Sequence, residues 1–172
     1  MMLKMVENNG LELRKLFRKM KKAGLTTSLD LCFPDPFQKT GRMDWKTILK
    51  HTLPLVDFFE PSIEELLFMW NNDLFAKLSA QGDILDQVDD AMLMDLSAEL
   101  LALGTAAVMI KLGHHGLFLR TSDESRLREA GFARPSDIPL WAGRTIRHPI
   151  FRVNVRGTTG AGDSSIAGFL SA

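Results

Sequence analysis

The chain has 172 residues, 45% of them hydrophobic, which is enough for one buried core, so a single globular domain is expected. Lysine plus arginine and aspartate plus glutamate each number 21, and this zero formal charge gives no general reason to expect nucleic acid or an anionic membrane as a partner. No apolar stretch reaches the roughly 20 residues of a spanning helix, so no membrane segment is expected.

The first half of the chain alternates predicted helices with predicted strands. Apolar and basic side chains over residues 9–23 recur at helical spacing, and Gly24 is placed to end that amphipathic helix. A buried strand is expected at 25–33, and a cluster of two prolines and an aspartate ends it. A helix at 45–53, a strand at 56–59 and a helix at 62–70 follow, and Ser62 and Glu65 have the spacing of a capping box.

The second half continues the alternation. A long helix is expected at 88–103, ended by Gly104, followed by a hairpin that pairs a strand at 106–112 with one at 117–120. Residues 121–139 are expected to form a surface connection, 141–155 two short strands, and 162–172 a further helix. Strands that alternate with helices predict a layered α/β domain with a mostly parallel sheet covered by helices.

The segment before the last predicted helix is a small-residue loop that contains Gly160, Ala161, Gly162 and Asp163. Glycines let the backbone turn sharply, and the free N–H groups at a helix start form a positive pocket for an anion such as a phosphate. A carboxylate in the first helical turn can accept a proton from a substrate hydroxyl as that hydroxyl attacks phosphorus. The loop therefore indicates phosphoryl transfer.

Two other interpretations of this loop remain open from its residues alone. The glycines could only shape a strand-to-helix turn, with Asp163 as a helix cap. Gly157, Gly160 and Gly162 also mimic a dinucleotide fingerprint, which would predict a dehydrogenase fragment that binds NAD. The chain contains no G-x-x-x-x-G-K-[ST] run, which disfavours a P-loop nucleotide site.

Several segments, in order, resemble one family. The run from Thr158 to Asp163, followed by Ala167, Gly168 and Phe169, is similar to the C-terminal signature of the ribokinase-like (PfkB) carbohydrate kinases. Residues 108–116 are similar to the family's strand and hairpin along the ATP site, and residues 59–65 fall at its N-x-x-E element. Residues 28–30 resemble the strand before its sugar-side loop. The resemblance implies a layered α/β/α ribokinase-like (Rossmann-like) domain.

The same resemblance implies roles for individual residues. Asp163 would be the catalytic base, and Gly160, Ala161 and Gly162 would form the anion hole. The nucleotide would lie along Lys111, Gly113, Gly116 and Thr158. Glu65 would act through water on Mg²⁺, helped by Ser62, which stands where the family has Asn. Asp30 would lie on the substrate side, although capping a turn before the prolines is an equally open role for it.

The implied activity is ATP-dependent phosphorylation of a hydroxyl on a sugar or nucleoside-like small molecule, with ATP and Mg²⁺ as cofactors. Family members also contain an N-terminal sugar-binding and lid portion and a C-terminal end that completes the adenine pocket. Residues 1–172 are therefore expected to be a partial kinase domain with little or no turnover alone. The alternative is a noncatalytic binding or assembly module, in which faces left uncovered by those missing segments favour a homo-oligomer.

The cysteine content favours a reducing compartment, and the histidines give no reason to expect a metal ion that they ligate. The lone Cys32 cannot form an internal disulfide, which predicts a cytoplasmic location. His114 and His115 are adjacent, and on an extended chain adjacent side chains point to opposite sides. A metal shared by these two histidines is therefore not expected.

Overall fold

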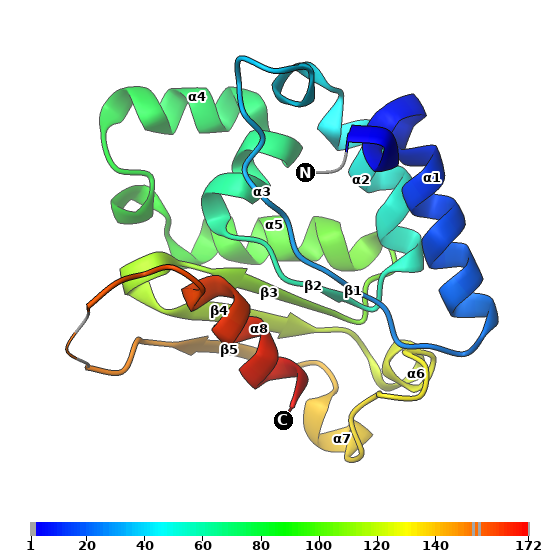
Figure 1. Ribbon diagram of the computed structural model, residues 1–172. Coiled ribbons are helices and arrows are strands. Elements are labelled where there is room, and N and C mark those ends of the chain that lie inside the picture. The colour runs from blue at the N-terminus through cyan, green and yellow to red at the C-terminus, as the bar shows by residue number, and fades with distance from the viewer. Residues whose placement is uncertain (1–2, 153, 155, 172) are drawn as a thin grey trace.

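A single mixed sheet forms the centre of the computed structural model, which describes residues 3–152, 154 and 156–171 (Figure 1). Its five strands follow one another in sheet order and in sequence: β1 (Ser28–Leu29), β2 (Phe58–Phe59), β3 (Ala107–Lys111), β4 (Leu117–Thr121) and β5 (Thr145–His148). The pairings β1–β2 and β2–β3 are parallel, and β4 runs antiparallel to both of its neighbours. Four of the five strands thus share one direction, as a mostly parallel sheet requires.

Eight α-helices lie in the described part of the chain. They are α1 (Leu3–Lys22), α2 (Trp45–Thr52), α3 (Ile63–Trp70), α4 (Asn72–Gln81), α5 (Asp90–Ala102), α6 (Glu124–Arg128), α7 (Ile138–Trp141) and α8 (Ala161–Leu170). Four 3₁₀ turns join them: η1 (Lys39–Arg42), η2 (Leu53–Leu55), η3 (Leu85–Gln87) and η4 (Gly113–His115). None of the helices in the described residues has both the length and the apolar character needed to cross a membrane.

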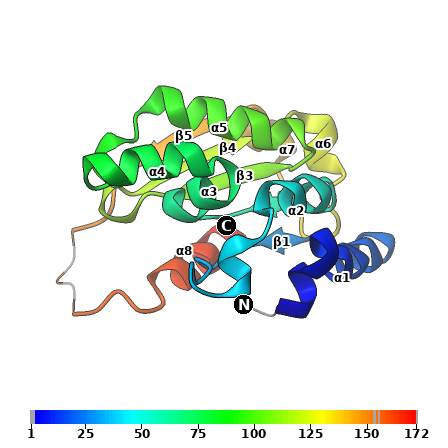
Figure 2. The same cartoon turned by 90° about the horizontal axis from the view of Figure 1, so that it is seen from above.

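The sheet separates two apolar clusters because side chains alternate along each strand. Val108 and Ile110 of β3 join the larger cluster, which is built with α1, α2, α3, α4 and α5. Ala107 and Met109 join the smaller one, which is built with α6 and α7 and covered by α8. Figure 2 shows α8 set apart from α4 and α5. Helices on both faces of the sheet confirm the predicted α/β/α layering.

The β3–β4 hairpin is also confirmed, with Lys111 opposite Leu117 at its tip. Gly113 and Gly116 have φ values of +53° and +90°, which residues other than glycine rarely adopt. A Cβ on Gly116 would lie 2.0 Å from the carbonyl oxygen of His148. This glycine is therefore required for the close approach of the chain after β5.

Four local features of the structure differ from the expectations or were not predicted. The strand expected at 25–33 pairs only at Ser28–Leu29, because β1 is an edge strand with one neighbour and leaves the ladder after Leu29. The connection at 121–139 contains α6 and the start of α7, each capped by the aspartate before it. Helix α4 has no predicted counterpart. Helix α1 consists of two helical parts separated by a break at Glu7–Gly10; the second part agrees with the helix expected at 9–23, and the first part, which begins at Leu3, was not predicted.

The remaining expected elements were placed at 141–155 and 162–172. Instead of two strands, the structure has the end of α7 and then β5 over the first part of 141–155. The second expected strand fell on Val153 and Val155, which lie outside the described residues. The last helix is present as α8, and Ala172, its expected last residue, also lies outside them.

Candidate active site

The loop before α8 turns into the helix at Gly160, whose φ of +78° is left-handed. The amide of Ala161 donates to the carbonyl oxygen of Thr158 at 3.1 Å, so this predicted anion-hole donor is turned back into its own loop. Among the described residues, no hydrogen bond engages the amides of Gly162 and Asp163. The amide of Gly160 also has no hydrogen-bond partner among the described residues, so the amides of Gly160, Gly162 and Asp163, at the positive end of the helix, are available to an anion.

A cavity of about 620 Å³ lies beside this helix start. The β3–β4 hairpin lines it with Lys111, Gly113 and Gly116, and α8 lines it with Ala161 and Gly162. Five of the predicted site residues, from segments almost 50 positions apart in sequence, thus meet around one space. Its lining is mainly apolar, as the base-binding part of a nucleotide site requires.

Asp163 is exposed and does not line this cavity. The α8 residues that do line it are those at positions 161, 162, 164, 165, 168 and 169. Asp163 therefore projects from a different side of the helix start. Its Oδ2 lies 4.0 Å from where a Cβ on Gly160 would stand, so the carboxylate stays close to the loop.

Lys111 and Asp30, predicted for different parts of the site, form an ion pair. The lysine Nζ lies 2.7 Å from Oδ1 of Asp30, and both side chains are largely buried. The same Nζ lies 3.6 Å from where a Cβ on Gly162 would stand. Because Lys111 ends β3 and Asp30 follows β1, the pair marks the carboxyl edge of the parallel strands, which is where open α/β sheets bind ligands.

Glu60, a residue that the sequence-based search missed, is fully buried at the same edge. Its Oε2 accepts a hydrogen bond of 2.9 Å from the hydroxyl of Ser28, whereas Oε1 has no partner among the described residues. Burial, together with the nearby charge of Asp30, raises the pKa of Glu60 to about 7, although Ser28 and Lys111 act in the opposite direction. The sequence feature that could have identified Glu60 as a candidate site residue is its position directly after an apolar strand.

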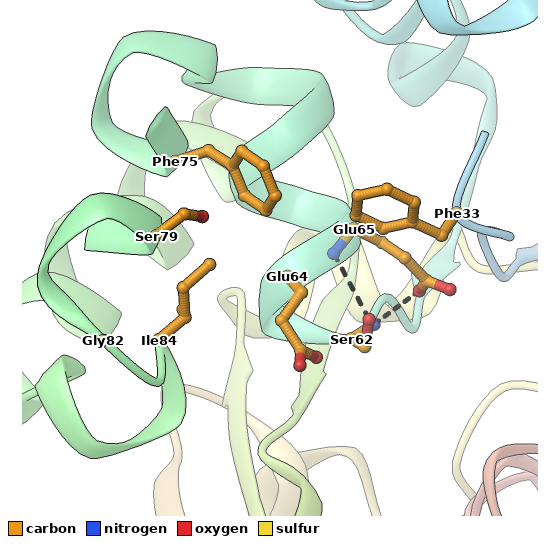
Figure 3. A pocket seen from close by; sticks show the side chains of 8 residues that line it. All are labelled: Phe33, Ser62, Glu64, Glu65, Phe75, Ser79, Gly82 and Ile84. Carbon is orange, nitrogen blue, oxygen red and sulfur yellow. Dashed lines mark hydrogen bonds between the residues drawn. The ribbon is translucent and has the colours of Figure 1, made fainter. Parts of the chain in front are cut away.

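Ser62 and Glu65 form the predicted capping box at the start of α3 (Figure 3). The amide of Ser62 donates to Oε2 of Glu65 at 2.9 Å, and the amide of Glu65 donates to the hydroxyl of Ser62 at 3.3 Å. Both residues line a second cavity of about 510 Å³, together with Glu64 and Phe33. A carboxylate and a hydroxyl suit Mg²⁺, but the cap already uses one oxygen of Glu65, which fits an indirect role better than direct ligation.

Lys111 lines the first cavity and is bridged to Ser62, which lines the second. The backbone of Ser62 forms a parallel bridge with Lys111, whose amide donates to the carbonyl oxygen of Pro61 at 2.9 Å. Gly162 lies against the side-chain end of the same lysine. The starts of α3 and α8, 100 positions apart in sequence, therefore both adjoin the last residue of β3.

These features define a ribokinase-like α/β/α domain with a glycine-shaped helix start at the carboxyl edge of its sheet. The family pattern described as pfkB family carbohydrate kinase matches residues 5–172. The chain belongs to this family. No curated protein matches the chain.

Solved structures show the same fold at low sequence identity. A PfkB protein from Polaromonas sp. JS666 has a TM-score of 0.57 at 22% identity over 95% of this chain and 40% of its own. Aminoimidazole riboside kinase from Salmonella enterica has a TM-score of 0.56 at 22% identity over 92% of this chain and 40% of its own. Arabidopsis thaliana ribokinase complexed with ribose and ATP has a TM-score of 0.56 at 21% identity over 94% of this chain and 38% of its own. The chain thus spans about 40% of the length of these structures.

Proposed function

We propose that this chain supplies the phosphoryl-transfer half of a kinase that uses ATP to phosphorylate a hydroxyl on a sugar or nucleoside-like small molecule. Family membership supports carbohydrate kinase chemistry in general. The particular roles rest on one observation: hairpin and helix residues enclose a cavity on one side of the start of α8, while Asp163 projects from another side. The family match favours a kinase over a dehydrogenase fragment.

In this proposal the nucleotide occupies the 620 Å³ cavity along Lys111, Gly113 and Gly116. Its transferred phosphoryl group reaches the amides of Gly162 and Asp163, where the helix dipole and the Lys111 charge offset the charge that develops during transfer. The acceptor hydroxyl lies on the Asp163 side, so that nucleophile and leaving group stand on opposite sides of the phosphorus. Asp163 accepts the hydroxyl proton.

Four further site residues have supporting roles in the proposal. Thr158 holds the loop through its carbonyl oxygen, which accepts from Ala161. Glu65, fixed by Ser62, would hold Mg²⁺ indirectly through water, and the metal would neutralise phosphate charge when it is bound. Asp30 holds the Lys111 ammonium group in place and marks the substrate side of the sheet edge.

The central test compares Asp163→Asn with the unchanged protein. We expect this chain alone to bind ATP without measurable turnover. When the sugar-binding segments of the family are supplied, Asp163→Asn should lower kcat by about 10²- to 10⁴-fold, because the general base is lost, and should leave ATP affinity within a factor of a few. Asp137→Asn, at the exposed cap of α7, is the matched control and should change neither quantity.

Three outcomes would contradict the proposal. Full activity of Asp163→Asn would remove this residue from catalysis. Self-association of the chain with no ATP binding would favour a noncatalytic assembly module, and phosphorylation by the chain alone would show that it is catalytically complete.

A further inference from the structure

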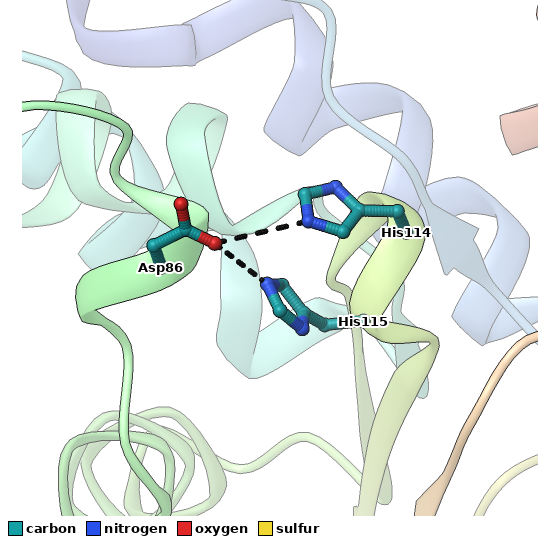
Figure 4. Close-up of side chains that lie close together, drawn as sticks. All are labelled: Asp86, His114 and His115. Atoms are coloured by element: carbon teal, nitrogen blue, oxygen red, sulfur yellow. Dashed lines mark hydrogen bonds and ion pairs between the residues drawn. The ribbon is translucent and has the colours of Figure 1, made fainter.

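Beside the proposed nucleotide cavity, three potential metal ligands from two separate turns come together (Figure 4). Nε2 of His115 lies 3.1 Å from Oδ1 of Asp86, and Nε2 of His114 lies 3.8 Å from the same oxygen. The two imidazole rings lie side by side, with centroids 4.1 Å apart and planes inclined by 40°. The expectation that adjacent histidines point to opposite sides was wrong, because they stand on a 3₁₀ turn and not on an extended strand.

Both turns are held by their own hydrogen bonds. In η4, the amide of His115 donates to the carbonyl oxygen of Leu112 at 2.9 Å, and the positive φ values of Gly113 and Gly116 close the hairpin around it. In η3, the amide of Leu85 donates to a carboxylate oxygen of Asp83 at 2.9 Å. The three ligand atoms are thus presented by backbone that is already ordered.

Packing fixes the two turns against each other. The side chain of Leu85 lies so close to Gly113 that a Cβ there would stand 2.9 Å from Leu85 Cδ1. Gln87 holds the far side of η3, since its side-chain amide donates to the carbonyl oxygens of Leu78 and Asp83 at 3.0 and 2.8 Å. Asp86, between Leu85 and Gln87, is therefore kept opposite the two histidines.

The spacing and the ligand types agree with a tetrahedral transition-metal ion. With metal-to-ligand bonds of about 2.0–2.2 Å, ligand atoms in a tetrahedral site stand roughly 3.3–3.6 Å apart. The three ligand atoms lie within 4.8 Å of one another, with the two distances to Asp86 on either side of that range. Imidazole nitrogens select ions of the zinc, cobalt, nickel and copper class and disfavour Mg²⁺.

We propose that Asp86, His114 and His115 form a site for a divalent transition-metal ion of the zinc class, with water in the fourth position. The side chains are 65%, 58% and 37% exposed, so an ion can enter from solvent. The site lies on the outer side of the hairpin tip, whose residue Gly113 lines the nucleotide cavity. It is separate from the proposed Mg²⁺ role of Glu65, and it requires neither a nucleotide nor turnover.

The test is a titration of the whole chain with Zn²⁺ by calorimetry and with Co²⁺ by visible absorption. Cys32→Ser serves as the background, because its exposed thiol would otherwise be a competing ligand. We expect one ion per chain, a tetrahedral Co²⁺ spectrum, no competition by Mg²⁺ and weaker binding as the pH is lowered, since a histidine must be neutral to ligate. Zn²⁺ should also raise the Tm.

Single variants decide whether these three residues are the ligands. His114→Ala, His115→Ala and Asp86→Asn should each weaken Zn²⁺ binding at least 10-fold and abolish the rise in Tm. His51→Ala, which removes an exposed histidine from α2, should leave both unchanged and is the matched control. Circular dichroism checks that each variant is folded. The absence of saturable Zn²⁺ binding, or equal binding by the three variants and His51→Ala, would overturn the proposal and leave an ordinary hydrogen bond between Asp86 and His115.

Discussion

The two ends of β2 each hold a fully buried carboxylate, and the protein treats them differently. Asp57 precedes the strand, and Glu60 follows it. Asp57 binds the ammonium group of Lys21 at 2.7 Å and the guanidinium group of Arg126 at 2.8 Å, and it also accepts from the amide and hydroxyl of Thr27. Among the described residues, the carboxylate of Glu60 has one hydrogen-bond partner, the hydroxyl of Ser28.

This difference separates a structural role at the amino end of β2 from a proposed ligand-binding role at its carboxyl end. The Asp57 network ties α1, the residue before β1 and α6 together at the amino edge of the sheet and satisfies the buried charge. At the carboxyl edge, Glu60 has an oxygen without a partner among the described residues, beside the Lys111–Asp30 pair. An unsatisfied buried oxygen at the carboxyl edge of a parallel sheet is consistent with the proposal that this edge binds a ligand.

The largest expected effect is on the free energy of unfolding, at the amino edge of the sheet. Asp57→Ala should lower the free energy of unfolding by about 3–5 kcal/mol, because it leaves two largely buried cations without their partner. Urea unfolding measures the loss. Asp95→Ala, at an exposed position of α5, should change it by less than about 0.5 kcal/mol. Equal losses of stability in the two variants would show that Asp57 has no special role in stabilising the fold.

The next effect concerns the pH dependence at the carboxyl edge. Folding raises the pKa of Glu60 from 4.5 to about 7, so the folded state binds a proton more tightly than the unfolded state. Stability should therefore fall as pH rises from 4.5 through 7, by at most about 3 kcal/mol. Urea unfolding at pH 5 and pH 8.5 measures this dependence.

Glu60→Gln removes the titrating group and should flatten that pH dependence. The variant should be more stable than the unchanged protein at pH 8.5, because no charge has to be buried there. Asp57→Asn, at the other end of β2, should leave this pH dependence of stability in place. An identical pH dependence in Glu60→Gln and the unchanged protein would show that another group is responsible.

A third experiment separates binding from stability at Lys111. Lys111→Met should weaken ATP binding by about 10- to 100-fold, because a charge-assisted contact to phosphate contributes about 1.5–3 kcal/mol. Asp30→Asn keeps the ammonium group and should retain most of the affinity. Calorimetric titration with ATP compares the two, with Lys77→Met in the exposed part of α4 as control. Unchanged affinity in Lys111→Met would place the nucleotide elsewhere.

The smallest effect concerns the cap of α3. Ser62→Ala should lower the free energy of unfolding by about 1 kcal/mol, because the amide of Glu65 loses its acceptor. Ser62→Asn should cost only a few tenths, since asparagine caps equally well. Thermal or urea unfolding of the two variants measures the difference. Equal losses would show that the hydroxyl contributes nothing specific to this helix start.

Local signals in the sequence were sufficient for much of the fold. The capping box at Ser62, the glycines of the β3–β4 hairpin and the small-residue start of α8 are properties of a few neighbouring residues, and the structure contains all three. The extent of β1 was overestimated, because an apolar run indicates burial without saying how many residues find a partner strand. The catalytic and nucleotide-binding roles assigned to Asp163, Thr158 and the other site residues stay predictions.

The sequence by itself determined the α/β alternation, the family signature and the chemistry available to the loop at Gly160–Asp163, since these depend on residue type and short spacing. Only the tertiary structure paired Lys111 with Asp30, 81 residues away, and brought Asp86 to the two histidines. It also buried Glu60 with one carboxylate oxygen that has no hydrogen-bond partner among the described residues. The physical reason is that burial and distance between segments far apart in sequence follow from how sheet and helices pack. No local pattern of residues encodes that packing.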